Sequence, residues 1–180
     1  MATATPASIA LRQDINKWYS SNSVFKDNST VKALYNLANS GASAQTLKDA
    51  IDDYNDMADN KTKGIKDSSG KNHYYPMVTI SSASLRLYNS EAAGQASKIS
   101  QGIIAWYNTH KANYQGIEKI EALKNLAQKP GVTYKELTDA IENYNNNYGY
   151  DADRDVNVGV KLADGKYHHY PPLVISNNGT

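Results

Sequence analysis

The stretch GKNHYYPMVTIS, residues 70–81, returns near the other end of the chain as GKYHHYPPLVIS, residues 165–176. Both copies follow the pattern G-K-x-H-x-Y-P-x-x-x-I-S. Similarity between distant stretches indicates an internal repeat, in which one structural unit occurs more than once. The pattern therefore predicts that each half of the chain ends on one copy of this closing stretch.

The residues that precede each copy repeat a helical pattern. Leu11, Ile15 and Trp18 are spaced i, i+4 and i+7, which places them on one face of a helix. Two more helices are expected to begin after Asn28 and Ser43, because both residue types cap helix N-termini. The second half matches the first at its apolar positions: Ile99, Ile103, Trp106 and Tyr107 in the first helix, Leu123 and Leu126 in the second, and LTDAIENYN (residues 137–145) against LKDAIDDYN (residues 47–55) in the third.

After the third helix the pattern changes to that of a hairpin, with two short strands expected within residues 63–74. The predicted fold class is mainly α (α+β): a tandem duplication of a module of three amphipathic helices followed by a short β-hairpin and closing segment. The first repeat module spans residues 1–81 and the second spans residues 99–180. Residues 82–98 are expected to form a linker and the start of the next helix, with Ser90 as its cap.

The composition limits the class of protein. Hydrophobic residues make up 40% of the 180 residues and charged residues 21%, which is typical of a globular chain. The formal net charge of +1 gives no bulk field that attracts nucleic acid, so no nucleic-acid partner is expected. The absence of cysteine excludes disulfides and thiolate chemistry. The chain has no apolar run of about 18–20 residues and no classical signal peptide, so a soluble protein is expected.

Tyrosine dominates the aromatic residues, with 14 Tyr against one Phe and two Trp. Tyrosine suits half-buried positions and contact surfaces, because its ring is apolar and its hydroxyl is polar. The two tryptophans, Trp18 and Trp106, are expected in the core. The candidate binding residues lie at repeated positions: His73, Tyr75, His168, Tyr170, Tyr19 and Tyr107.

The paired His73 and His168 admit two interpretations. Histidine can serve as a general base, a metal ligand or a phosphate contact. No Ser, Asp or Glu stands in a recognisable catalytic spacing with either histidine, which favours a structural role in which each one hydrogen-bonds backbone beside the helices. Tyr75 and Tyr170 likewise either form a ligand platform or anchor the core. No catalytic residue is assigned.

Two charged segments add further candidates. Residues 151–159, DADRDVNVG, alternate oxygen donors as a calcium loop does, but Val156 and Leu162 stand where an EF-hand needs Gly and Glu. A solvated acidic loop is therefore favoured, and no metal or cofactor is expected. The first hairpin is locally basic, which suits anionic lipid headgroups such as phosphoinositides, through Lys61, Lys63, Lys66 and Lys71.

The motif D-A-I-x-x-Y-N within residues 47–55 and 137–145, the closing stretches and the richness in Asn, Lys and Tyr together carry a resemblance to a known group. In these features the chain resembles the RavJ-like C-terminal accessory domains of bacterial type IV secretion effectors. The resemblance implies an accessory, partner-binding role inside a host cell after secretion. It implies no catalytic residue.

Three hypotheses for the function follow. The first is a non-enzymatic protein-interaction module, an accessory domain of a secreted bacterial effector that acts in the host cytoplasm as a monomer with a protein partner. The second is an anionic-lipid binding module that reaches a membrane through the basic hairpin. The third is an enzyme with a site between the two repeats, in which His73 or His168 works with a carboxylate of the third helix.

Overall fold

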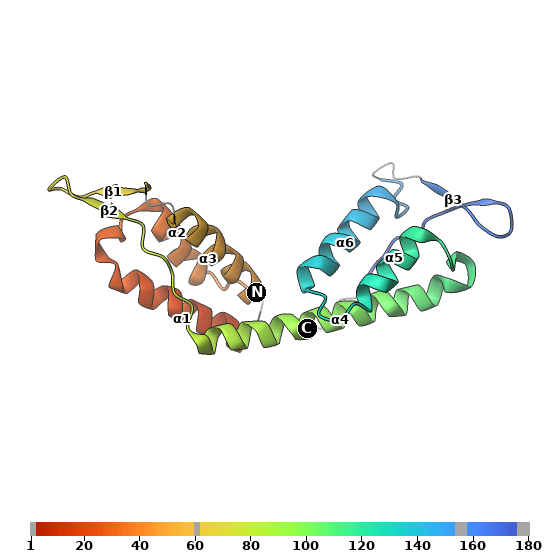
Figure 1. Cartoon of the computed structure of the whole chain (residues 1–180), viewed down its shortest axis with the longest axis horizontal. Helices are drawn as coiled ribbons and strands as arrows, with labels where there is room; N and C mark the ends of the chain where they lie inside the picture. Colours follow the sequence, from red (N-terminus) through yellow and green to blue (C-terminus); the bar gives the residue numbers. More distant parts are fainter. Residues whose placement is uncertain (1–2, 60–61, 154–157, 176–180) are drawn as a thin grey trace. The chain divides into compact units, whose positions relative to one another are not determined.

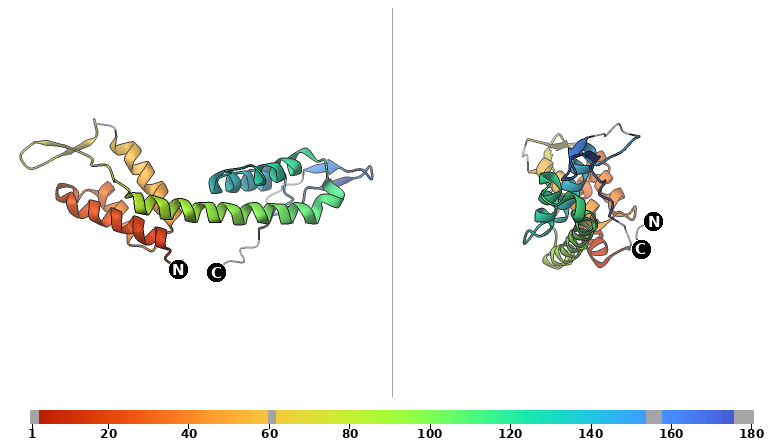
Figure 2. Two further views of the ribbon diagram at one scale, coloured as in Figure 1. Left: turned by 60° about the horizontal axis from the view of Figure 1, so that its bottom comes forward. Right: turned by 90° about the vertical axis from the view of Figure 1, so that its right-hand side faces the viewer.

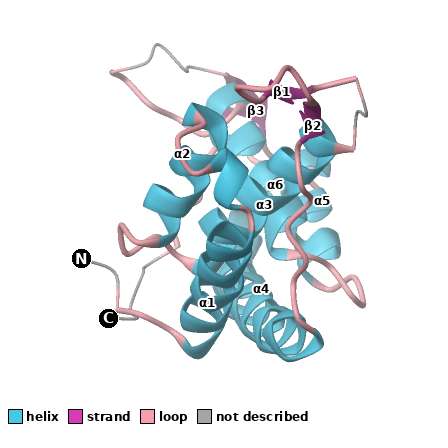
Figure 3. Cartoon of the chain, turned by 90° about the vertical axis from the view of Figure 1, so that its left-hand side faces the viewer, coloured by secondary structure: helices cyan, strands magenta, loops and turns pink. Residues whose placement is uncertain are grey.

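The computed structural model describes residues 3–59, 62–153 and 158–175. Helices make up most of this part of the chain, and the strands form two small antiparallel hairpins (Figure 3). The predicted mainly α (α+β) fold class is therefore confirmed. The chain divides into two compact units, Met1–Glu91 and Ala92–Thr180, which we call unit 1 and unit 2.

Unit 1 contains three helices followed by a hairpin (Figure 1). The expected caps are confirmed, since Asn28 accepts hydrogen bonds from the Thr30 and Val31 amides and Ser43 accepts one from the Thr46 amide. A single 3-10 turn, Ser23–Phe25, joins the first two helices. The elements of unit 1 are α1 (Pro6–Ser21), α2 (Ser29–Ala38), α3 (Ala44–Ala58), β1 (Gly64–Lys66) and β2 (Asn72–Tyr74).

The core of unit 1 lies between its three helices. Leu11, Ile15 and Ile51 are fully buried, as the i, i+4, i+7 pattern predicts. Trp18 is also buried, and its ring meets that of Tyr54 edge-on with centroids 5.1 Å apart. Edge-to-face contact of this kind adds stability beyond the burial of apolar area. The apolar stripes of the helices therefore meet in one cluster.

Unit 2 has the same order of elements, beginning with the latter part of a long helix. Its own buried residues include Ile103, Ile120 and Leu137. Helices α5 and α6 lie side by side, and the hairpin extends beyond their ends (Figure 2). The elements are α4 (Ser82–Tyr114), α5 (Glu118–Ala127), α6 (Tyr134–Asn147), β3 (Gly159–Lys161) and β4 (Tyr167–His169).

Helix α4 corrects one expectation about the segment between the modules. Ser82 already begins the helix, so a helix start at Ser90 is wrong. The cap is Ser81, whose Oγ accepts a hydrogen bond from the Ser84 amide at 3.2 Å. Residues 82–98 contain neither proline nor a residue with positive φ, so nothing interrupts the helix between Ser81 and the second module.

Each hairpin turns at a glycine in the left-handed region, Gly70 with φ of 81° and Gly165 with φ of 78°. The strands pair antiparallel, with Ile65 opposite His73 and Val160 opposite His168. After each hairpin the described chain continues as a segment without regular strand structure, apart from one isolated bridge between Tyr170 and Gly149 in unit 2. In unit 1 this segment runs along the helices to the start of α4 (Figure 1).

Within the described residues, none of the helices combines the length and the apolarity needed to cross a bilayer.

Candidate functional site

The closing segment of each unit is held by one asparagine of the preceding helix. Asn55 of α3 donates from Nδ2 to the carbonyl oxygen of Val78 at 2.9 Å and accepts from the Val78 amide at 2.8 Å. Asn145 of α6 makes the same two bonds to Leu173, both at 2.8 Å. The amide side chain thus acts as a short β-strand partner, with one donor and one acceptor. Val78 and Leu173 are buried beneath it.

Aromatic donors hold the same segment on the other side. In unit 1 the Trp18 indole N–H and the Tyr54 hydroxyl both donate to the carbonyl oxygen of Pro76, at 3.1 and 2.9 Å. In unit 2 these bonds go to neighbouring carbonyls: Trp106 donates to Pro172 at 3.0 Å and Tyr144 to Pro171 at 2.8 Å. Proline cannot continue a ladder through its nitrogen, but its carbonyl oxygen remains an acceptor.

Burial keeps the two tyrosine hydroxyls of this arrangement protonated. Desolvation raises the pKa of Tyr54 well above its ordinary value, and the neighbouring Tyr75 adds to the effect. Desolvation likewise raises the pKa of Tyr144, with Tyr170 as the next cause. Both hydroxyls are therefore donors at any physiological pH. The repeated D-A-I-x-x-Y-N motif contributes this tyrosine and the clamping asparagine in each unit.

Tyr75 and Tyr170 each pack against other aromatic rings of their own unit. The Tyr75 ring lies 5.5 Å from that of Phe25, and its hydroxyl accepts a hydrogen bond from Asn28 Nδ2 at 3.1 Å. The Tyr170 ring lies 5.5 Å from that of Tyr148, and desolvation raises the pKa of its hydroxyl. Of the two interpretations, these contacts favour the core anchor over the ligand platform.

His73 and His168 each hydrogen-bond an aspartate of their own hairpin turn. His73 Nε2 lies 2.7 Å from Asp67 Oδ2, and His168 Nε2 lies 2.8 Å from Asp164 Oδ2. The expected bonds to backbone are thus replaced by bonds to carboxylates. The sequence carries a signal for these pairs, D-x-x-G-K-x-H in one hairpin and D-G-K-x-H in the other. The different turn lengths conceal the match between the two aspartates.

The aspartates of these pairs also organise the turns. Asp67 Oδ1 accepts from the Ser69 amide and hydroxyl and from the Lys71 amide, and these bonds, led by the Ser69 hydroxyl, hold the pKa of the Asp67 carboxyl well below its ordinary value. The Lys166 amide, followed by His168, lowers the pKa of Asp164. Each carboxylate thus satisfies the backbone of its own turn as well as the histidine.

Tyr19 and Tyr107 occupy matching positions but have different surroundings. Tyr19 is half-buried, stacks on Tyr35 with centroids 4.1 Å apart, and donates to the Lys26 carbonyl oxygen at 2.9 Å. Tyr107 is buried and donates to Glu121 Oε1 at 2.6 Å. Neither of these candidate binding residues is fully exposed.

Of the candidate lipid-binding lysines, Lys63, Lys66 and Lys71 are exposed on the first hairpin, and Lys61 lies outside the described residues. Tyr74, exposed over 57% of its surface, lies on the same hairpin. The hairpin therefore combines exposed cations with an exposed aromatic ring.

The carboxylates that the sequence offers as metal ligands or catalytic groups are not the ones that hydrogen-bond the histidines. Among the described residues, no group of three or more His, Asp or Glu side chains could hold a metal ion, and Arg154–Asn157 of the acidic loop lie outside the description. On the third helices, Asp52 pairs with Lys48, and Asp139 pairs with Lys135 at 2.7 Å. The carboxylates that the histidines contact are those of the hairpin turns.

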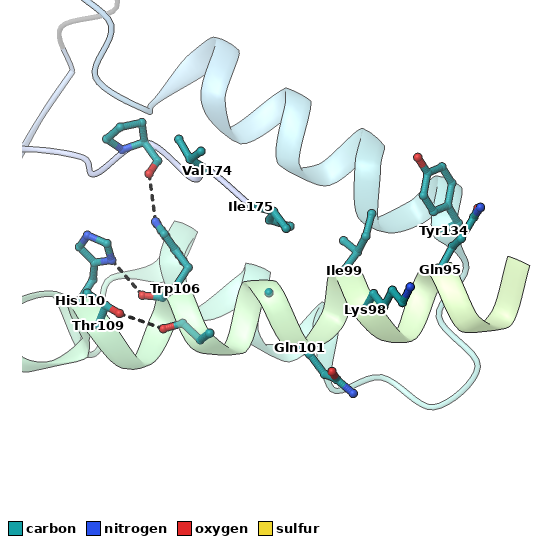
Figure 4. Close-up of a pocket in the computed structure, with 13 residues that line it drawn as sticks. Gln95, Lys98, Ile99, Gln101, Trp106, Thr109, His110, Tyr134, Val174 and Ile175 are labelled. Atoms are coloured by element: carbon teal, nitrogen blue, oxygen red, sulfur yellow. Dashed lines mark hydrogen bonds between the residues drawn. The ribbon is translucent and has the colours of Figure 1, made fainter. Parts of the chain in front are cut away.

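A groove of about 970 Å³ lies in unit 2 between α4, the start of α6 and the closing segment (Figure 4). Its apolar lining comprises Ile99, Gly102, Ala105, Trp106, Pro172, Val174 and Ile175. Its polar rim comprises Gln95, Lys98, Gln101, Thr109 and His110. Tyr134, the first residue of α6, stands at one end (Figure 4). Sequence reasoning missed this site, because its apolar residues have the spacing of a core face.

Internal hydrogen bonds fix the side chains at the other end of the groove. His110 Nδ1 donates to the Trp106 carbonyl oxygen at 2.9 Å, and the Trp106 indole is held by Pro172 (Figure 4). Gly102 permits the close approach of the closing segment, because a Cβ there would lie 2.8 Å from Ile175 Cγ2. The Trp106 and His110 side chains at this end of the groove are thus held by hydrogen bonds to backbone.

Neither the family models, nor the curated proteins, nor the solved structures provide a match to this chain.

Proposed function

We propose that the chain is a non-enzymatic protein-interaction module, built as a tandem duplication and serving as an accessory domain of a secreted bacterial effector. The observation that carries the proposal is the groove of unit 2, with an apolar floor, a polar rim and a volume of about 970 Å³. Apolar surface with a rim of polar groups is characteristic of protein contact sites.

The surroundings of the repeated residues support a binding role over catalysis. Tyr54, Tyr144, Asn55 and Asn145 hold the closing segments, and His73 bonds the carboxylate that shapes its own turn. A general base must be able to reach the proton that it abstracts. The repeated tyrosines, asparagines and histidines thus make hydrogen bonds within their own units. The surface available for contact with a protein partner is the groove of unit 2.

Site-specific photo-crosslinking tests the proposal. A photoreactive amino acid at position 101, on the groove rim, is predicted to form adducts with a defined protein in eukaryotic cell extract. The same group at position 108, an exposed α4 position outside the groove lining, is the matched control and should form none. Adducts that are the same from both positions, or that persist when Ala105→Arg fills the groove, would contradict the proposal.

The effector assignment rests on the resemblance to RavJ-like accessory domains. Its test is separate: fusion to a translocation reporter in a bacterium with a type IV secretion system, compared with the same strain lacking the secretion ATPase. Reporter signal in host cells that depends on the ATPase is expected. Equal signal from both strains would remove this part of the proposal.

Anionic-lipid binding is a second candidate function, favoured by the exposed Lys63, Lys66, Lys71 and Tyr74 of the first hairpin. Each lysine near an anionic surface contributes about 1 kcal/mol of attraction. Flotation with phosphoinositide-containing liposomes is expected to recover the chain, and replacing the three lysines by glutamate to abolish recovery. Unchanged recovery would eliminate this candidate.

A further inference from the structure

The groove of unit 2 corresponds in sequence to positions that are buried in unit 1. Leu11 and Ala44 of unit 1 match Ile99 and Tyr134 of unit 2 in sequence. Leu11 and Ala44 are buried, with exposed fractions of 0% and 2%. Ile99 and Tyr134 are half-buried and line the groove. The same face is thus buried in unit 1, whereas the described residues of unit 2 leave it partly exposed.

In unit 1 the start of the helix that follows the closing stretch contacts both α1 and α3. The Ser81 amide donates to Asp14 Oδ2 of α1 at 2.8 Å, and Ser81 then caps α4. Two turns later Tyr88 packs against the core, and its hydroxyl donates to Gln45 Oε1 of α3 at 2.9 Å. An N-capped helical segment, residues 82–88, therefore runs from α1 to the start of α3.

In unit 2 the residues that match these contact positions of unit 1 line the groove. Gly102 stands at the position of Asp14, Ile175 at that of Ile80, and Tyr134 next to the position that matches Gln45. All three line the groove. Within residues 92–153 and 158–175, no segment lies over it as residues 82–88 lie over unit 1.

The charge at the rim adds a preference that unit 1 lacks. Lys98, exposed at the groove edge, matches the uncharged Ala10 of unit 1. A cation at the edge of an apolar groove favours partners that carry an acidic side chain beside their apolar face. Binding of a helix through its apolar face, with anchors at i, i+3, i+4 and i+7, is an established mode of peptide recognition.

We infer that the groove binds one amphipathic α-helix of a partner protein, in the place that residues 82–88 occupy on unit 1. The helix sets an apolar face with an aromatic residue onto Ile99, Tyr134 and Ile175, and an acidic residue near Lys98. This inference rests on the proposed interaction function and names the class of partner.

A helical peptide tests the inference directly. The probe is a lactam-stapled peptide with the sequence of residues 81–91, SSASLRLYNSE, whose helicity is verified by circular dichroism. Titrated into the full ¹⁵N-labelled chain, it is expected to shift the amide signals of Gly102, Ala105 and Ile175, with a Kd below about 1 mM. The peptide that carries Tyr88→Ala is expected to bind at least about tenfold more weakly, because aromatic anchors dominate such contacts.

Matched chain variants provide the control. Ala105→Arg places a charge in the groove from an exposed helix position and should weaken binding at least about tenfold, whereas Asn108→Arg, also exposed on α4, should not. Equal thermal unfolding of both variants confirms that folding is intact. No shift at about 1 mM peptide, shifts outside the groove, or binding unaffected by Ala105→Arg would overturn the inference. If crosslinking from position 101 then still captures a protein, the interaction function stands and only the helical class of partner is wrong.

Discussion

Asn145 holds Leu173 by two hydrogen bonds of 2.8 Å, one to each polar group of its backbone. Asn55 holds Val78 in the same manner. After β2 and β4 each closing stretch therefore stays on the helices of its unit through side-chain hydrogen bonds, those of the asparagine and those of the tryptophan and tyrosine donors. The Tyr-Asn dipeptide and the Tyr-Pro stretch both recur in the sequence. In each unit the first of them hydrogen-bonds the proline of the second and the segment that follows it.

Replacing Asn145 by leucine is expected to destabilise the chain by about 2–4 kcal/mol. Leucine has the same number and branching of side-chain heavy atoms but leaves the amide and carbonyl of Leu173 without partners, and each unsatisfied buried group costs about 1–3 kcal/mol. Urea unfolding followed by circular dichroism measures the change. Asn108→Leu, at an exposed position of α4, is the control and should change stability by less than about 0.5 kcal/mol. Similar losses in both variants would refute the clamp.

The ionisation of Glu121 is expected to make the stability of unit 2 depend on pH in the acid range. Hydrogen bonds from Lys124, from the Tyr107 hydroxyl and from the Gly116 amide lower the pKa of Glu121 from 4.5 to about 2. Because this pKa is lower in the folded chain, the ionised carboxylate stabilises the fold above about pH 4.5, and that contribution is lost as the pH falls toward 2.

The Glu121→Gln variant should therefore lose stability less steeply than the native chain between pH 4.5 and 2, as followed by the urea midpoint. At neutral pH the variant should be less stable, because the bonds to Lys124 and Tyr107 weaken. Glu142→Gln, an exposed substitution on α6, provides the matched charge change. A pH profile of Glu121→Gln that coincides with that of the native chain would show that Glu121 does not titrate as described.

Two glycines should respond in opposite directions to replacement by alanine. Gly70 has φ of 81°, a conformation that costs an L-residue about 1–2 kcal/mol, so Gly70→Ala should destabilise by about that amount. Gly94 lies within α4 with open space around it, so Gly94→Ala should stabilise by about 0.5–1 kcal/mol. Thermal unfolding gives both signs in one experiment. Stabilisation by Gly70→Ala would mean that the first hairpin turn is built differently.

The apolar periodicity predicted the helices and most of the core. Leu11, Ile15 and Ile51 are buried where their spacing placed them, and Asn28 and Ser43 cap as their chemistry suggested. These features depend on neighbours three or four residues apart, so they can be inferred from local sequence.

Features that depend on distant contacts were missed. The hydrogen bond between Asp67 and His73 could not be inferred from the repeat. The two hairpin turns differ in length, so their aspartates do not align with each other. The helix start at Ser81 was placed at Ser90, since both serines precede helix-forming residues and only the contact with Asp14 distinguishes them. The groove follows from a difference in burial between matched residues, which sequence similarity conceals.

The repeated stretch closes each unit and is held by the asparagine of the third helix. Amide hydrogen exchange of Val78 and Leu173, measured by NMR, is the decisive test of this closure, because both amides donate to an asparagine side chain while their exposed neighbours Thr79 and Val174 provide an internal reference. Val78 and Leu173 are expected to exchange at least about a hundredfold more slowly than Thr79 and Val174, as amides that open only with the core do. Exchange of all four at the rate of an unstructured peptide would contradict it.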